Sequence, residues 1–540
     1  MLFLCGKSSD MRYLFILLAL CLATSCALKQ KQYPNPAPSS DALPQLREQQ
    51  MRAEHDTLVS YIKQVSPVIC FNKEVRGIDF SRHAARLRKQ IGPKATMEAY
   101  LHIIKKTLNA AQDGHTSQLN TVLLDIAKKY WIPGGLVSFD SASTQNMYKY
   151  VKYLKESFYS KADLNLIYTS GSYYNLMPFS YRGKAYPAGM KLIRCNGKNI
   201  HKFVSTLTQL YAPLRWDRVN NRVYDENFYW PAEIYKQDTL RLTFVDQQYR
   251  KHQLNINKND SVTYLAKKLN HYGYFSQTDT VVTHYFEQEG IFYAKLPAMR
   301  TELGDTIKRR MEAIFARHHV NSVVIDIRGN GGGSDQTYNI FLKKLLSDTL
   351  KKDVVVGRNF SSETRKKYHL NRDSVINSNN KTFNPGVPQF KSQEMYFIKQ
   401  SFNFVTPDRA RFPFNGKIYI LQDKFIYSSA SNLSSLAQNT KQLISIGETP
   451  DLLGGLQADV LIKMLPYSKF IFRVEPQVDF TGIKKLEDVF QNHVEYPVSY
   501  PIDNLYLRTI SKDIFGKNFL LKNDPMFRKV LELEQIALAN

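Results

Sequence analysis

Acidic side chains are scarce in this sequence: 48 Asp and Glu stand against 73 Lys and Arg, and the formal net charge is +25. Such a balance favours an acidic partner, for example nucleic acid or an anionic membrane surface. The basic residues are spread along the whole chain, however, and no helix, finger or RNP-type motif accompanies them. We therefore expect no nucleic-acid partner. The 540 residues, 43% of them hydrophobic, are enough for about two to four globular domains.

The start of the chain lacks an apolar run long enough for a permanent membrane helix. Arg12 precedes the short run 13–22, which is typical of a signal peptide. The run leads into Ala-Thr-Ser-Cys at 23–26, and small residues ahead of a Cys resemble a bacterial lipobox. This resemblance implies removal of residues 1–25 and a lipid on the thiol of Cys26. The lipid would hold the protein in the bacterial cell envelope, facing the periplasm or the cell surface. The alternative is an ordinary cleaved signal with an incidental Cys, and either one exports the protein.

Cysteines are few, five in all. Once residues 1–25 are removed, Cys26, Cys70 and Cys195 remain. If Cys26 carries the lipid, one disulfide between the other two is possible, and the sequence leaves its formation open. Residues 26–41 are rich in Pro, Ser and Gln and lack apolar periodicity, so we expect a flexible tether between the lipid and the folded body.

Helical patterning follows the tether, in residues 42–158. Apolar side chains recur at three- and four-residue spacing, which places one apolar stripe toward a core. They are Met97, Tyr100, Leu101, Ile104 and Leu108. This helix runs into Asp-Gly-His-Thr at 113–116, where Gly and Asp are expected to end it. A helical N-terminal domain that carries His115 is therefore predicted.

Short β-rich segments separated by turns are predicted for residues 159–262. The Asn196-Gly197 pair is a strong signal for a tight turn between apolar runs. The stretch 187–198 resembles the segment of PDZ domains that ends in an Asn-Gly turn and is followed by a helix, here 200–210. A PDZ-like domain is the preferred interpretation, and a β-hairpin in another mixed domain is the alternative.

Strands and helices alternate in residues 263–540, which predicts an α/β domain. The candidate strands are 291–296, 323–327, 418–421 and 443–446, and the candidate helices are 303–315 and 432–437. The run 323–327 is short and, apart from Asp326, apolar, as in a buried strand. A polar, Asn- and Lys-rich insert at about 354–412 interrupts the order, and we interpret it as a long surface excursion or lid.

The sharpest local pattern is a glycine loop that starts at the end of this run. It reads Asp326-Ile-Arg-Gly-Asn-Gly-Gly-Gly-Ser334 and leads into a helix that begins near Gln336. Backbone amides in such a loop can approach an anion without obstruction by side chains. The spacing fits neither the dinucleotide fingerprint, in which Ser334 replaces the last Gly, nor the P-loop, which needs a Lys. We therefore prefer an oxyanion hole to a nucleotide-phosphate site.

A second pattern places small residues between the strand at 418–421 and the next helix. It reads Ile426-Tyr-Ser-Ser-Ala-Ser-Asn-Leu433. The hydroxyl of Ser428 would lie at the N-terminus of that helix, a position that stabilises a developing negative charge and exposes Oγ to a substrate. The alternative is a plain Ser cap of the helix.

The two patterns, together with Ile446-Gly-Glu-Thr449, resemble the S41 peptidases in order and spacing, across the C-terminal half of the chain. The family includes C-terminal processing and tricorn-like branches. The resemblance implies a ClpP/crotonase-like α/β catalytic domain and a serine peptidase whose nucleophile is Ser428. It also implies that the amides of Ser429 and of Gly331 or Gly332 line the oxyanion hole. Ser429 is the fallback nucleophile.

The base of such a peptidase differs between the two branches. The Ser/Lys branch has a Lys shortly after the Gly-Glu-Pro-Thr-like segment, but residues 449–455 contain none. Tricorn-like members take their base from a His well upstream of the nucleophile, and the segment 113–116 looks like that element. An imidazole suits the role because its unperturbed pKa of about 6.5 allows it to accept a proton near neutral pH. His115 is therefore the predicted base, with a surface or capping His in a turn as the alternative.

A base His is expected to have an acidic partner that holds its tautomer. Tricorn-like members supply a Glu near the C-terminal end, and the family-like Glu-Asn pair reads Gln491-Asn492 here. The resemblance then makes Glu487 the candidate acid or leaves the acid missing. A solvated surface charge is the alternative for Glu487.

An active enzyme would be an exported serine endopeptidase that cleaves peptide bonds of envelope or extracellular proteins through a Ser428 acyl-enzyme. It would need no metal or organic cofactor, and the adjacent His318 and His319 lack a metal-binding spacing. The alternative is a catalytically impaired S41-like peptide-binding lipoprotein, because a PDZ module adds a peptide strand without cleaving it.

Overall fold

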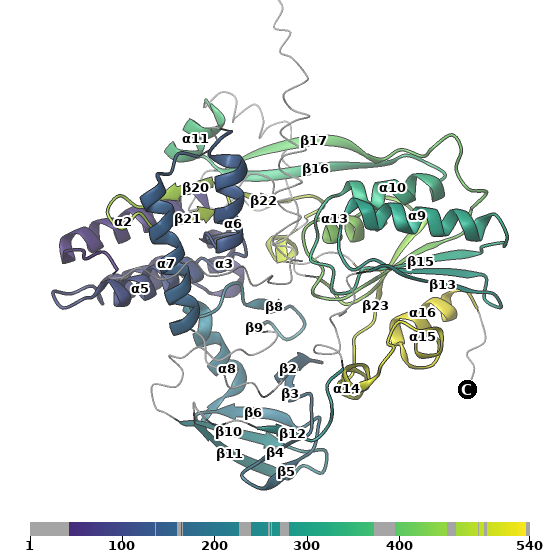
Figure 1. Cartoon of the computed structure of the whole chain (residues 1–540), viewed down its shortest axis with the longest axis horizontal. Coiled ribbons are helices and arrows are strands. Elements are labelled where there is room, and N and C mark those ends of the chain that lie inside the picture. The colour runs from purple at the N-terminus through teal and green to yellow at the C-terminus, as the bar shows by residue number, and fades with distance from the viewer. Residues whose placement is uncertain are drawn as a thin grey trace, which may run out of the picture.

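The computed structural model describes residues 43–535 apart from 135–136, 159–163, 165, 226–238, 258–259, 261, 270–279, 372–394, 451–460, 484 and 491–493 (Figure 1). The predicted signal peptide, the lipidation site Cys26 and the tether lie outside the described residues. Within the described residues, no helix combines the length and the hydropathy that a bilayer crossing needs. Cys70 and Cys195 are not joined by a disulfide, so the bond that the sequence left open is not formed.

Helices dominate the first described part of the chain. They include α2 Glu48–Val65, α3 Val68–Arg76, α4 Phe80–Arg88, α5 Met97–Ala110, α6 Thr121–Ile126 and α7 Ser141–Phe158. Thr96 caps α5, because its side chain accepts a hydrogen bond from the amide of Ala99. The predicted apolar stripe of α5 is buried. The core of these helices also includes β20 Leu461–Met464 and β21 Ile471–Val474, which return from late in the chain. Residues 42–158 therefore do not complete this core by themselves.

The middle of the chain is β-rich, as the sequence predicts. One sheet has the order β11-β10-β6-β3-β2 with β7 paired to β6, a smaller sheet has the order β12-β4-β5, and β8 pairs with β9. The strands are β2 Leu166–Thr169, β3 Ser172–Asn175, β4 Phe179–Tyr181, β5 Lys184–Tyr186, β6 Lys191–Cys195, β7 Lys198–Asn199, β8 Arg215–Asp217, β9 Arg222–Tyr224, β10 Thr239–Val245, β11 Lys251–Asn257 and β12 Thr263–Tyr264. Asn196 and Gly197 both adopt positive φ and connect β6 to β7, so the predicted tight turn is present. The helix after it is shorter than predicted, because α8 Ile200–Val204 gives way to the 3-10 turn η2 Ser205–Gln209.

A mixed sheet of order β13-β14-β15-β18-β19-β23 organises the last part of the chain (Figure 1). Its strands are β13 Val282–Phe286, β14 Ile291–Lys295, β15 Ser322–Asp326, β18 Ile418–Gln422, β19 Leu443–Gly447 and β23 Tyr496–Pro497. All of them run parallel except β13, which is antiparallel to β14. The predicted α/β order is present, and β15 and β18 end side by side.

Helices cover both faces of this sheet. One face shares a core with α9 Thr301–Phe315, α10 Gln336–Leu345 and α13 Ser429–Leu436. The other shares a core with α14 Ile502–Ile510, α15 Lys517–Asn523 and α16 Pro525–Leu533. This arrangement buries strands that carry apolar side chains on both faces, which explains the apolar residues at 323–325.

The predicted insert begins and ends as regular structure. β16 Leu350–Asn359 pairs antiparallel with β17 Met395–Val405, and also with β22 Gln477–Asp479. α11 Ser362–Tyr368 follows β16 and contacts α2. The described ends of the insert thus form a sheet that contacts the helical part, and residues 372–394 lie outside the described residues.

Candidate active site

Ser428 lies at a sharp turn between β18 and α13. Its backbone adopts φ 51° and ψ −124°, a region that residues other than glycine rarely enter. Strained backbone of this kind clusters at functional sites, where the surrounding structure compensates it. The Ser428 carbonyl accepts a hydrogen bond from the amide of Asn432 in the first turn of α13. Ser428 therefore lies at the N-terminus of a helix, where the sequence places it.

The glycine loop meets Ser428 where β15 and β18 end. Gly332 adopts φ 99°, and a Cβ atom added to it would lie 2.7 Å from the Cβ of Ser428 and 2.6 Å from the carbonyl oxygen of Tyr427. A larger residue would therefore displace the backbone of the turn. The amide of Tyr427 donates a hydrogen bond of 3.1 Å to the carbonyl of Asn330. The two patterns that the sequence shows separately thus form one site.

The amides around Ser428 differ in their hydrogen bonds. Gly332 donates its amide hydrogen to Asn330 Oδ1 at 2.9 Å. In the part of the chain that the structure describes, the amides of Gly331 and Ser429 have no acceptor. Of the two candidate glycines, Gly331 therefore has the available donor, and Ser429 offers the second one.

The hydroxyl of Ser429 is held by a carboxylate. It donates a hydrogen bond of 2.5 Å to Asp335 Oδ1, and Asn432 donates to Asp335 Oδ2 at 3.3 Å. Only 2% of Ser429 is exposed. Burial raises the pKa of Asp335. Since the Ser429 hydroxyl is engaged and covered, the geometry favours Ser428 over this fallback nucleophile.

His115 lies in a turn whose residues on either side are held by hydrogen bonds. The Asp113 carboxylate accepts hydrogen bonds from the His115 amide at 3.1 Å and from the Thr116 hydroxyl at 2.6 Å. Gln112, which adopts φ 53°, donates its side-chain amide to the carbonyl of Thr208 at 2.7 Å. The turn ends α5, as predicted, and its hydrogen bonds fix the position of the imidazole.

Glu475 is the carboxylate that faces His115. Its Oε2 lies 3.6 Å from His115 Nδ1, and the exposed fractions of the two side chains are 0% and 8%. β1 Ser117–Gln118 follows the His115 turn and pairs with β21, which directly precedes Glu475. Glu475 also donates its amide to the Thr116 hydroxyl at 3.3 Å. No sequence motif marks this residue, because a pairing between strands 356 positions apart brings it to the His.

The predicted acid, Glu487, lies elsewhere. It is an exposed residue of the 3-10 turn η6 Leu486–Phe490, and among the described residues it makes no contact with His115. The Gln491-Asn492 pair that pointed to this region lies outside the described residues. The structure therefore does not support Glu487 as the partner of His115. The prediction relied on position along the chain, whereas strand pairing selects the carboxylate.

Comparison with known proteins identifies the family of the part of the chain that holds Ser428. Residues 290–473, which include the glycine loop and Ser428, match the model of Peptidase family S41. The chain is an S41 peptidase. It is therefore a serine-type hydrolase. No curated protein sequence matches the chain.

Solved structures extend the likeness over nearly the whole S41 peptidase. Mature CPAF complexed with lactacystin has a TM-score of 0.52 at 9% identity, over 90% of this chain and 99% of that chain. Mature CPAF has a TM-score of 0.51 at 10% identity, over 91% of this chain and 99% of that chain. Identities this low show a shared fold alone.

The surroundings of His115 keep its imidazole neutral. Burial, with a smaller contribution from the Arg473 guanidinium, lowers the pKa of His115 to about 3. The negative charge of the facing Glu475 acts in the opposite direction. At neutral pH the ring is therefore uncharged, which is the form that accepts a proton. Within the described residues, no group of three or more His, Cys, Asp and Glu side chains is placed to hold a metal ion.

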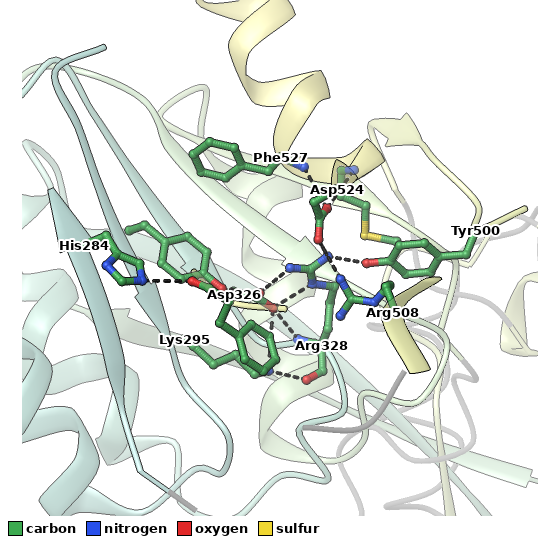
Figure 2. A network of polar contacts seen from close by, with 11 residues as sticks. His284, Lys295, Asp326, Arg328, Tyr500, Arg508, Asp524 and Phe527 are labelled. Carbon is green, nitrogen blue, oxygen red and sulfur yellow. Dashed lines mark hydrogen bonds and ion pairs between the residues drawn. The ribbon is translucent and has the colours of Figure 1, made fainter. Parts of the chain in front are cut away.

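A buried ionic network holds the start of the glycine loop (Figure 2). The Arg328 guanidinium contacts Asp326 Oδ1 at 2.9 Å and Asp524 Oδ2 at 2.6 Å. Arg508 shares Asp524 Oδ2 at 2.7 Å, and Lys295 donates to the Arg328 carbonyl. All five side chains are buried. Desolvated charges of this kind are strongly destabilising when one partner is removed. The network therefore fixes the strand end from which the glycine loop departs in this S41 peptidase.

Proposed function

We propose that this S41 peptidase is an exported serine endopeptidase in which Ser428 is the nucleophile, His115 the general base and Glu475 its acidic partner. One observation supports the proposal above all others: the turn that bears Ser428 contacts the glycine loop at Gly332, beside the buried His115–Glu475 pair. Tyr427, the residue before Ser428, contacts the His115 ring. The turn that bears the nucleophile therefore touches the residue proposed as the base.

In the acylation step, the Ser428 hydroxyl transfers its proton to the neutral imidazole of His115 while Oγ bonds to the carbonyl carbon of the peptide. The amides of Gly331 and Ser429 stabilise the oxyanion that forms. His115 then gives the proton to the leaving amine as the C–N bond breaks. A water molecule then gives a proton to His115 and attacks the acyl carbon, and His115 returns this proton to the Ser428 oxygen as the acyl-enzyme bond breaks. Throughout, the Glu475 carboxylate stabilises the transient imidazolium.

The alternative, a catalytically impaired peptide-binding lipoprotein, has less support. It drew on the absent Lys in residues 449–455 and on the uncertain acid near Glu487. A buried Glu475 beside His115 supplies a carboxylate where the alternative assumed none. A His base with this partner needs no Lys.

We also infer a ClpP/crotonase-like catalytic domain preceded by a helical N-terminal domain and a PDZ-like domain. The sheet with helices on both faces supports the first of these. The tight turn at Asn196-Gly197 followed by α8 supports the last. A module of this kind would bind a substrate segment as an added strand at a sheet edge.

A fluorescent fluorophosphonate probe tests the chemistry. We expect the probe to label the wild-type protein, Ser428→Ala to abolish the labelling and His115→Ala to slow it strongly. Ser429→Ala is the control for the fallback nucleophile, because it removes the neighbouring hydroxyl and keeps the backbone amide. We expect its labelling to persist, slowed at most by the loss of the hydrogen bond to Asp335. A folded wild-type protein that retains peptides and is never labelled would support the peptide-binding alternative instead.

The envelope location is a separate part of the proposal and rests on the lipobox resemblance at Cys26. A lipid at this position would tether the peptidase where its substrates, envelope or extracellular proteins and peptides, are found. Expression in a bacterium fed an alkyne-tagged palmitate is expected to tag the wild-type protein and not Cys26→Ser. Equal tagging of the two proteins, or none, would contradict the anchor without affecting the proposed chemistry.

A further inference from the structure

Tyr427 occupies an unusual place, between the nucleophile and the base. Its amide donates to the carbonyl of Asn330, and its own carbonyl accepts from the amide of Ala430. That carbonyl also lies against Gly332, as the 2.6 Å distance to an added Cβ shows. The backbone of Tyr427 is therefore held on both sides. Any rearrangement at this residue has to come from rotation of its side chain.

The hydroxyl of this side chain lies on the imidazole of His115. It is 3.3 Å from Nε2 and 3.5 Å from Nδ1, and the two rings are 5.4 Å apart between centroids. A Cβ atom on Gly114 would lie 3.0 Å from the same hydroxyl oxygen, so the glycine leaves room for it. The half-buried Tyr427 is thus seated against the turn that carries the base.

The two nitrogens of His115 differ in what else they face. Nδ1 faces Glu475 at 3.6 Å, so Nε2 is the nitrogen left to accept the proton of the nucleophile. In the described chain no hydrogen bond joins Ser428 to His115. The Tyr427 hydroxyl instead lies against the imidazole, slightly nearer to Nε2 than to Nδ1. At 3.3 Å this hydrogen bond is longer than the usual 2.9–3.0 Å, so it is weak and easily exchanged.

We propose that the Tyr427 hydroxyl caps His115 Nε2 in the substrate-free enzyme and gives up this position to the Ser428 hydroxyl when an acyl group enters. This inference rests on the proposed function. Tyr427 is then a positioning residue that acts through His115. In the opposite role, Tyr427 would pass the Ser428 proton on to His115. Loss of the Tyr427 hydroxyl would then slow the reaction of Ser428, whereas loss of a cap would speed it.

Tyr427→Phe separates the two roles, because it removes the hydroxyl and keeps the ring. The assay is the second-order rate of labelling by the fluorophosphonate probe. In this reaction the Ser428 Oγ bonds to phosphorus, fluoride leaves, and the Oγ proton passes to His115 Nε2. If the hydroxyl is a cap, Tyr427→Phe is labelled roughly twofold to tenfold faster than wild type, the range expected for one hydrogen bond. An equal or slower rate overturns the proposal, and a strongly slower rate indicates a relay.

Tyr285→Phe is the matched control. The Tyr285 hydroxyl donates to the carbonyl of His319 on the surface, so we expect an unchanged rate. A faster rate in both variants would overturn the proposal, because it would not depend on the contact with His115. Thermal melting is measured alongside, and a gain of rate with equal or lower stability still supports the cap. Labelling that is absent from wild type and variant alike, or that survives Ser428→Ala, would refute the proposed function itself.

Discussion

Replacement of Glu475 by Gln removes a buried charge from the site while preserving the size of the side chain. The carboxylate lies 3.6 Å from His115 Nδ1 and is fully buried. Two unit charges about 4 Å apart interact by about 4 kcal/mol at an effective dielectric constant of about 20. This energy is available only when His115 is protonated, that is, between proton transfer from Ser428 and its return. Loss of the charge therefore raises the barrier, by an amount that corresponds to roughly a thousandfold in rate.

The assay is kcat/KM for hydrolysis of unfolded casein, with the labelling rate of the fluorophosphonate probe as a second measure. Glu487→Gln is the matched control, since Glu487 is exposed and does not contact His115. We expect the control to remain within about twofold of wild type, as is usual for surface substitutions. If Glu475→Gln keeps more than about a tenth of the wild-type rate, the carboxylate does not stabilise the imidazolium. If Glu487→Gln loses as much as Glu475→Gln, the assignment of the acid is wrong.

Because burial lowers the pKa of His115 to about 3, probe labelling is expected to keep its neutral rate down to about pH 5, and a fall centred near 6.5 would contradict this. The unfolded chain binds a proton at that imidazole below about pH 6.5 and the folded chain does not, so thermal melts are expected to show stability falling as the pH drops from there toward 3. Asp335→Ala removes the carboxylate that holds the Ser429 hydroxyl. Misplacement of the Ser429 amide is then expected to slow labelling by up to about a hundredfold. An unchanged rate would show that Asp335 does not position this amide. Arg328→Met removes the cation that Asp326 and Asp524 share and leaves each of these buried carboxylates with one cationic neighbour, Lys295 or Arg508. Urea denaturation is expected to show a loss of about 3–5 kcal/mol in the free energy of unfolding. A loss below about 1 kcal/mol would show that the network relaxes.

The sequence by itself determined the parts of the site that depend on local backbone geometry. The glycine loop is recognisable because Gly332 has no room for a Cβ atom beside Ser428. Ser428 is recognisable because small residues surround a turn between a buried strand and a helix. The α5 stripe and the α/β order follow from apolar periodicity, which is set by the geometry of each element. In each case the physical requirement falls on neighbouring residues and leaves a pattern there.

Only the tertiary structure decided which carboxylate faces His115. Glu475 reaches it through the pairing of β1 with β21, strands 356 positions apart. The same holds for the place of the Tyr427 hydroxyl beside Nε2 and for the strands that end the insert. These contacts depend on which distant segments pair, and that choice is made by the packing of whole layers. No single segment carries a sequence signature of such a contact, because the contact depends on the partner segment as much as on the segment itself.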